Sequence, residues 1–200
     1  MVSLTGYVVT WRVVAAAASL ALSVACTDNG SKVNPTPPPM PIIGTAACPG
    51  ADQLLAAPAP DGRRLPDVEL NCLGHPGSVP MRRLGRIPTV VNLWAGWCAP
   101  CAREMPAMQR VSQATAGRVL FLGVDTKDNE RVARETIQAT GVSYASVVDP
   151  DEVVRNAVNT IGLPTTLLIG TDGRIRKVFP GELTEADLRT ALRDEFGITG

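Results

Sequence analysis

Several features are scarce in this 200-residue chain, and each scarcity narrows the kinds of protein that it can be. Aromatic residues make up only 4% of the sequence, so the core must consist mainly of Val, Leu, Ile and Ala. Lys and Arg total 19, as do Asp and Glu, and this balance gives no sign of a nucleic-acid partner. The sequence contains one histidine, His75, which leaves few ligands for a zinc site.

The apolar run at the N-terminus is too short to cross a bilayer. It extends from Val13 to Ala25 and is interrupted only by Ser19 and Ser23, whereas a membrane-spanning helix needs about 20 apolar residues. An apolar run of this length behind Arg12 is typical of a signal-peptide core. We therefore expect residues 1–25 to be a signal peptide that directs the rest of the chain out of the cytoplasm.

The run ends in Leu22-Ser-Val-Ala-Cys26, which resembles the lipobox of bacterial lipoproteins. The resemblance implies cleavage before Cys26 and a lipid on its sulfur, which would anchor the protein at the outer face of the cytoplasmic membrane. The usual leucine three residues before the cysteine is Ser23 here. Ordinary cleavage, or an uncleaved anchor that also uses Val8 and Val9, are the alternatives, and all three place the domain outside the cytoplasm.

The composition of residues 26–46 predicts a tether. Its prolines lie among Asn, Gly, Ser and Thr, and they are Pro35, Pro37, Pro38, Pro39 and Pro41. Such a segment is extended and semi-rigid, and it has too little apolar surface to fold. A proline-rich ligand for a partner domain is the alternative. We expect the folded domain at residues 47–200, because about 150 residues suffice to bury a core.

The chain is organised around residues 89–106. Thr89 to Ala95 is a short, mostly apolar run with β-branched residues, which predicts a buried strand. Cys98 and Cys101 follow, where a helical segment begins that extends from about Pro100 to Ala116. A cysteine at a helix N-terminus faces unpaired N–H groups and the positive end of the helix dipole, which favour the thiolate. The second sulfur lies one turn away, so the pair can exchange electrons with a substrate through a mixed disulfide.

Trp97-Cys-Ala-Pro-Cys101 after an apolar strand resembles the active site of the thioredoxin-like superfamily. The longer segment from Asn92 to Pro106 is similar to the TlpA/ResA-like branch of membrane-tethered thiol-disulfide oxidoreductases, and the resemblance covers residues 65–200. It implies a protein-disulfide oxidoreductase that needs no cofactor, acts on protein thiols and disulfides, and exchanges electrons with a membrane donor or acceptor. A reductant, for example in cytochrome c maturation, is favoured over an oxidase-type disulfide donor.

A bare Cys-x-x-Cys also occurs in metal sites, so binding proteins are the competing class. Zinc needs two further ligands that this sequence does not supply at suitable spacing, and no metal site is predicted. Copper suits reduced thiolates, which makes a copper chaperone the alternative. Copper-handling proteins of this fold use a wider cysteine spacing and a distal histidine, however. A peroxidase of the same fold would not need Cys101 or Trp97.

The resemblance also assigns roles to residues around the dithiol. Cys98 is expected to be the exposed attacking thiolate, with a pKa below the free value of about 8.5, and Cys101 the more buried resolving thiol. Ala99 and Pro100 fix the geometry of the disulfide ring. The expected substrate contacts are Trp97, Pro100 and Leu163.

Two further residues gain a role from the resemblance. Pro164 is expected to be a cis-proline that lies against the dithiol and presents the preceding backbone to an extended substrate; the alternative is a proline that merely starts a strand. Asn92 stands where ordinary thioredoxins carry a buried acid. The related branch has a glutamate on the helix instead, matched by Glu104, which shares a helix face with Cys101. We expect Glu104 to accept a proton or to select substrates, with a solvated surface glutamate as the alternative.

The five cysteines can all be assigned. If Cys26 carries the lipid and Cys98 pairs with Cys101, then Cys48 and Cys72 are left for each other. A disulfide between them suits an extracytoplasmic protein. We expect it to be structural rather than a second redox pair, because nothing near either cysteine activates it.

The remaining pattern predicts an α/β, thioredoxin-like fold with a central mixed sheet flanked by helices. Residues 65–81 suggest an N-terminal hairpin. Further strands are expected at residues 119–124, 145–148, 165–169 and 174–179, and helices at residues 128–140, 149–162 and 184–196. The strand and helix between Gly141 and Gly162 are additional to the minimal thioredoxin plan and match an insert of TlpA/ResA-like proteins.

Overall fold

The computed structural model describes residues 46–57 and 62–199. The predicted signal peptide, residues 1–25, lies outside them, as does all but the last residue of the predicted tether, residues 26–46. Within the described ranges, no helix is both long and apolar enough to cross a membrane.

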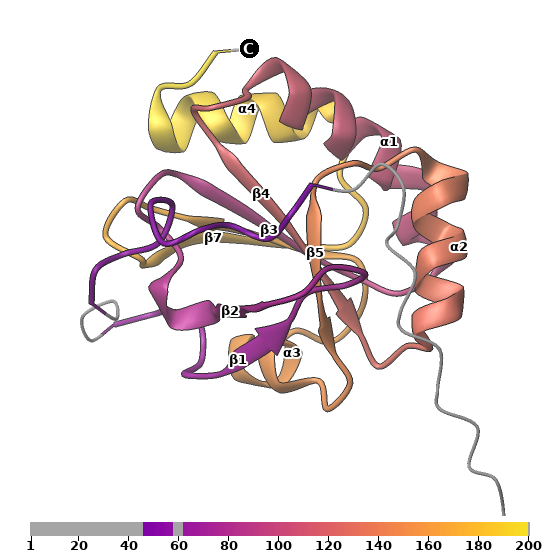
Figure 1. The fold of residues 1–200 in the computed structure, drawn as a ribbon. Helices are drawn as coiled ribbons and strands as arrows, with labels where there is room; N and C mark the ends of the chain where they lie inside the picture. The colour runs from indigo at the N-terminus through magenta and orange to yellow at the C-terminus, as the bar shows by residue number, and fades with distance from the viewer. Residues whose placement is uncertain (1–45, 58–61, 200) are drawn as a thin grey trace, which may run out of the picture. The chain divides into compact units, whose positions relative to one another are not determined.

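A five-stranded mixed sheet forms the centre of the domain (Figure 1). Its order is β5-β4-β3-β6-β7, with bounds Ala145–Asp149, Leu120–Thr126, Thr89–Trp94, Thr165–Ile169 and Ile175–Pro180. β3, β4 and β5 run parallel, whereas β6 and β7 are antiparallel to their neighbours. The predicted mixed sheet is therefore confirmed, and the carboxyl ends of its three parallel strands meet at one edge.

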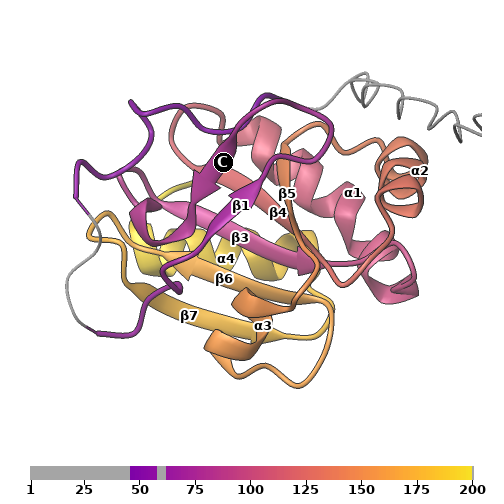
Figure 2. The same ribbon diagram turned by 60° about the horizontal axis from the view of Figure 1, so that its bottom comes forward.

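Two different layers cover the faces of this sheet (Figure 2). One face carries α1 (Ala99–Ala114), α2 (Glu130–Thr140) and α4 (Glu185–Phe196). The other carries the hairpin of β1 (Glu69–Asn71) and β2 (Ser78–Pro80), the short η1 (Met81–Arg83), and α3 (Val153–Val158). The N-terminal hairpin and the extra strand and helix, β5 and α3, are both present as predicted.

Side chains along β3 point alternately to the two faces of the sheet, and this determines which of them face the helices. Val90 and Trp94 pack in the core beneath α1 and α4, whereas Val91 and Leu93 pack on the hairpin side. Successive side chains of a strand point to opposite faces. Asn92 therefore faces the helices, and all six residues of β3 are buried.

Local signals set most helix boundaries. The Asn129 side chain accepts a hydrogen bond from the N–H of Arg131 and so caps α2, which ends at Gly141 with φ of 69°. Thr184 and Asp187 form a reciprocal capping box at the start of α4. The prediction was wrong for α3, which spans only Val153–Val158 instead of residues 149–162.

The short α3 has a local cause. Asp149 is the last residue of β5, and its carboxylate accepts hydrogen bonds from the N–H groups of Val153 and Val154 at 2.9 Å each. These bonds start the helix several residues after Asp149. Asn159 has a left-handed conformation with φ of 53°, which ends the helix.

A disulfide joins Cys48 to Cys72, with their Cα atoms 6.1 Å apart. Cys72 follows β1 and forms an isolated bridge with Val147 of β5, while the N–H of Ala46 donates to the carbonyl of Ser143. The disulfide therefore ties the start of the described chain to the hairpin. Cys72 belongs to the core on the hairpin face of the sheet, and the partly buried Cys48 packs against it.

Replacing both Cys48 and Cys72 with Ala is expected to lower the free energy of unfolding by about 3 kcal/mol, because the unfolded chain regains the freedom of the closed loop. The expected sign is a lower melting temperature in calorimetry. The potential of the other disulfide should stay nearly unchanged, because that disulfide packs in the core on the opposite face. A large shift in that potential would instead indicate an electron relay between the two pairs.

Candidate active site

The dithiol lies at the first turn of α1, directly after the carboxyl end of β3. Cys98 is the N-cap residue, and its sulfur accepts a hydrogen bond from the N–H of Cys101 at 3.2 Å. Cys98 and Cys101 form a disulfide with a Cα–Cα distance of 5.3 Å. Pro100 occupies the first turn, where the N–H that proline lacks has no partner within the helix. The two cysteines therefore lie at the helix N-terminus, as predicted.

One expectation about this pair was wrong, because Cys98 is not exposed. Its exposed fraction is 4%, against 0% for Cys101. The disulfide bond holds the Cys98 sulfur against the fully buried Cys101, and both pack in the core cluster with Met105. In this oxidised state Trp97, which is 59% exposed, is the prominent side chain at the site. The expected low pKa of the Cys98 thiol stays a prediction, because a disulfide sulfur does not titrate.

The backbone before Cys98 is fixed to the loop that follows β4. The N–H of Gly96 donates to the carboxylate of Asp128, and the indole N–H of Trp97 donates to the carbonyl of Lys127 at 3.1 Å. Gly96 is needed for this approach, since a Cβ atom there would lie 2.7 Å from a methyl of Val132 and 2.8 Å from the Asp128 carboxylate. These contacts were not predicted from the sequence. Asp125 and Asp128, near the carboxyl end of a parallel strand beside β3, are the residues in the sequence that could have indicated contacts with this loop.

Leu163 and Pro164 lie in the loop before β6. The peptide bond between them is cis, Pro164 is buried, and its carbonyl accepts a hydrogen bond from the N–H of Gly181 at 2.9 Å. Leu163 is half-buried and packs against the core cluster that contains both redox cysteines. The loop also carries Ile161, which is almost fully exposed and which the sequence analysis did not single out.

Glu104 lies one turn after Cys101 and is buried, with an exposed fraction of 2%. One of its oxygens accepts a hydrogen bond from the Asn92 amide at 2.7 Å, and the other accepts one from the N–H of Leu183 at 2.9 Å. Asn92 also donates to the hydroxyl of Thr166 at 3.2 Å. The alternative of a solvated surface glutamate is therefore wrong, and the Asn92 amide holds the buried carboxylate in place.

Burial changes the proton affinity of this carboxylate. Desolvation raises the pKa of Glu104 from 4.5 to about 7, although the hydrogen bonds from Leu183 and Asn92 oppose the rise and the charge of Glu182 adds to it. A carboxyl group with a pKa near neutrality can both accept and release a proton at physiological pH. A buried carboxyl group with a raised pKa thus lies on the same helix as the dithiol.

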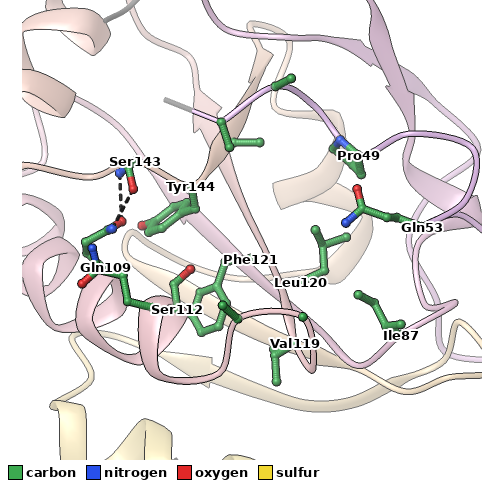
Figure 3. A pocket seen from close by; sticks show the side chains of 16 residues that line it. Pro49, Gln53, Ile87, Gln109, Ser112, Val119, Leu120, Phe121, Ser143 and Tyr144 are labelled. Carbon is green, nitrogen blue, oxygen red and sulfur yellow. Dashed lines mark hydrogen bonds between the residues drawn. The ribbon is translucent and has the colours of Figure 1, made fainter. Parts of the chain in front are cut away.

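A separate groove of about 280 Å³ lies at the other end of the strands (Figure 3). Its lining includes Val119 and Leu120 at the start of β4 and Tyr144 just before β5. On one side of it Gln109 and Ser143 exchange two hydrogen bonds, of 2.7 and 2.8 Å. The groove contains neither redox cysteine. The described residues also include no cluster of three or more His, Cys, Asp or Glu that could hold a metal ion.

Comparison with known proteins gives matches over most of the folded domain. The Redoxin family model matches residues 60–192. A thiol-disulfide oxidoreductase named ResA from Geobacillus thermodenitrificans is 31% identical over 103 residues, which are 51% of this chain and 59% of that protein. The chain therefore spans less than two thirds of that relative's length.

Solved structures show the same fold. StoA from Bacillus subtilis is 25% identical with a TM-score of 0.52, and the match covers 62% of this chain and 96% of StoA. A thiol:disulfide interchange protein of the thioredoxin family from Chlorobium tepidum is 24% identical with a TM-score of 0.57, covering 70% of this chain and 97% of that chain. The predicted thioredoxin-like fold is confirmed by these likenesses.

Proposed function

The chain belongs to the Redoxin family, and from this membership and the geometry of its dithiol we propose that it is a protein-disulfide oxidoreductase that works outside the cytoplasm. The observation that carries the proposal is the Cys98–Cys101 disulfide at the N-terminus of α1, with the buried Glu104 one turn further along the helix. The ResA protein from Geobacillus, itself named a thiol-disulfide oxidoreductase, supports the same reaction class.

In the reducing direction, the Cys98 thiolate attacks one sulfur of a client disulfide and releases the other as a thiolate. Cys101 then attacks the Cys98 sulfur of this mixed disulfide, which breaks the bond to the client. The client has gained two electrons and the enzyme disulfide has formed. Cys101 must lose its proton to attack, and Glu104 on the same helix has the proton affinity to take it.

The client approaches over the apolar side chains that surround the dithiol. Trp97 is exposed, and Pro100 and Leu163 are half-buried beside the two cysteines. The resemblance to thioredoxin-like proteins suggests that the backbone before Pro164 receives the client, and Leu163 packs against the core cluster that contains both redox cysteines. These contacts suit an extended protein segment around the reacting cysteine rather than a small molecule.

We further propose that the enzyme works as a reductant, recharged by a membrane electron donor, and that apocytochrome c thiols in cytochrome c maturation are an example of its clients. The resemblance of residues 92–106 to the TlpA/ResA-like branch favours this direction. An oxidase-type disulfide donor is the alternative. The standard potential of the Cys98–Cys101 couple separates the two roles, since a reductant of extracytoplasmic disulfides needs a potential near that of thioredoxin, about −270 mV, and an oxidant one closer to about −120 mV.

The reaction itself is tested by reduction of insulin disulfides with dithiothreitol as the electron source. We expect the protein to accelerate the reduction. A parallel isothermal titration of the reduced protein with Cu(I) tests the binding alternative. Tight copper binding without insulin reduction would replace the proposed enzyme by a copper chaperone of the same fold.

We propose that a lipid on Cys26 holds the domain at the outer face of the cytoplasmic membrane. The support is the sequence alone, in which a short apolar run ends at Ala25-Cys26. Cys26→Ser is expected to move the protein from the membrane fraction to the soluble extracytoplasmic fraction, as measured by fractionation and immunoblotting. Unchanged membrane association of this variant would indicate an uncleaved N-terminal anchor.

A further inference from the structure

Two carboxyl groups lie directly behind the backbone that leads to Cys98. Asp125 is the penultimate residue of β4 and is 3% exposed, and one of its oxygens is buried without a hydrogen-bond partner. Asp128 lies in the loop between β4 and α2 and lines the same cavity as Asp125. The proposed reaction uses neither residue.

Asp128 connects this pair to the active-site loop. One of its carboxylate oxygens accepts the hydrogen bond from Gly96, and the other accepts one from the N–H of Asn129 at 2.7 Å. The neighbouring Lys127 has a left-handed φ of 50°, which a residue other than glycine adopts only when its surroundings fix it. Its carbonyl accepts the bond from Trp97, and its N–H donates to the carbonyl of Asp149 at 3.0 Å.

The loop of residues 126–129 therefore determines where Gly96 and Trp97 lie, and these two residues immediately precede Cys98. The contact is close, because no side chain larger than that of glycine fits at position 96 without displacing Val132 or Asp128. A shift of Asp128 would thus be passed on to the backbone that carries the attacking sulfur.

We propose that Asp125 and Asp128 share one proton, and that this proton holds the 126–129 loop against Gly96 and Trp97, so that Asp125 acts through Asp128 as a positioning residue for Cys98. The proposal rests on the proposed thiol-disulfide chemistry for its functional meaning. Its structural content, the shared proton and its effect on Gly96, can be measured separately.

The surroundings favour the protonated form of Asp125. Burial raises the pKa of Asp125 from 3.8 to about 8, and the charge of Asp128, its hydrogen bond and the charge of Glu130 add to the rise. Other charged groups nearby are already engaged. Asp149 at the end of β5 accepts two backbone N–H bonds from α3, and Lys127 pairs with Glu152.

The direction of the pH effect follows from these contacts. Below about pH 8, a protonated Asp125 can donate a hydrogen bond to Asp128 and keep both carboxyl groups together. Above that pH both are charged and repel each other. A cavity of about 190 Å³ lined by Asp125, Asp128, Glu130, Val148 and Pro150 offers space into which a carboxylate can move. The hydrogen bond that the Gly96 N–H donates to Asp128 is then the contact that weakens.

Nuclear magnetic resonance of the oxidised wild-type protein tests the shared proton directly, because no redox thiol titrates in that state. The side-chain carboxyl resonance of Asp125 should titrate with a midpoint near pH 8, and the amide resonance of Gly96 should move with the same midpoint. In Asp125→Asn, which keeps the shape and can still donate to Asp128, the Gly96 resonance should not move in this range. Glu104→Gln is the matched control, since it removes another buried carboxyl group whose pKa is raised and should leave the Gly96 transition in place.

Kinetics test the positioning role. The reduction rate of the oxidised protein by a small dithiol is compared for wild type and Asp125→Asn between about pH 7 and pH 9, so that the ionisation of the dithiol cancels in the ratio. The wild-type rate relative to the variant should fall by roughly threefold to tenfold as Asp125 ionises, the scale expected for a small misplacement of a reacting group. A flat ratio overturns the positioning role.

Two results of the magnetic resonance experiment would contradict the shared proton. The shared proton is wrong if Asp125 titrates near its ordinary pKa, or if Gly96 moves equally in wild type and Asp125→Asn. The wild-type titration needs no variant, so the test stands even if Asp125→Asn fails to fold. If the wild-type protein fails to reduce insulin but its Gly96 amide resonance still moves near pH 8, the proposed function is contradicted and the shared proton is not.

Discussion

Replacing Cys98 by Ser is expected to abolish disulfide exchange, lowering the rate of insulin reduction by more than about a thousandfold. The reason is that the thiolate is the nucleophile, and a serine hydroxyl neither ionises at neutral pH nor forms a disulfide. Cys101→Ser should behave differently, because Cys98 can still attack but no second thiol resolves the product. This variant should accumulate a mixed disulfide with the client.

The measurement is intact-protein mass spectrometry after reaction with a disulfide-linked client peptide. We expect the mass of one peptide to be added to Cys101→Ser and nothing to be added to Cys98→Ser. Equal trapping by both variants, or none by either, would contradict the assignment of attacking and resolving roles. The double replacement of Cys48 and Cys72 serves as the control, since it removes a disulfide from the opposite face of the sheet.

Glu104→Gln is expected to slow the decay of the mixed disulfide by roughly a hundredfold, the usual cost of losing a general base. Glutamine preserves the shape but cannot take the proton of Cys101. The pKa of Glu104 is raised to about 7 by burial, so the wild-type carboxyl group is protonated below that pH and cannot serve as a base. Wild-type decay should therefore accelerate as pH rises through 7, and the variant should lack this component.

Stopped-flow measurement of mixed-disulfide formation and decay separates the two steps. Formation on Cys98 should be about as fast in Glu104→Gln as in wild type, or slightly faster, because a nearby negative charge has gone. Glu135→Gln is a suitable control, since Glu135 is an exposed carboxylate that pairs with Arg131 on α2. Identical decay of wild type and Glu104→Gln from about pH 6 to pH 8 would assign the proton to another group or to water.

Much of the fold could be predicted from the sequence because local signals set it. The β-branched run at Thr89 predicts β3, and the Thr184–Asp187 capping box marks the start of α4. The helix-start position of Cys98 follows from the same reasoning, since the strand and the helix on either side have clear patterns. These features depend on residues close together in the sequence.

The features that could not be predicted depend on contacts between distant segments. The burial of Cys98 results from its packing with Cys101 and the core, which the local pattern does not contain. The bond between Gly96 and Asp128 joins residues on two different strand ends, and the hydrogen bond from Leu183 to Glu104 joins α1 to the segment before α4. A sequence alone gives the residue types for such contacts but not their distances.

The placement of the two disulfides on opposite faces of the sheet has a consequence for repeated turnover. The Cys98–Cys101 bond lies at the N-terminus of α1 and belongs to the core on the helix face of the sheet, while the Cys48–Cys72 bond lies against the core on the hairpin face. Thiol–disulfide exchange requires a thiolate to attack a disulfide sulfur directly. The sheet keeps the two cysteine pairs apart, so they cannot exchange with each other. The Cys98–Cys101 disulfide can therefore be reduced and re-formed in every catalytic cycle while the Cys48–Cys72 disulfide continues to hold the hairpin in place.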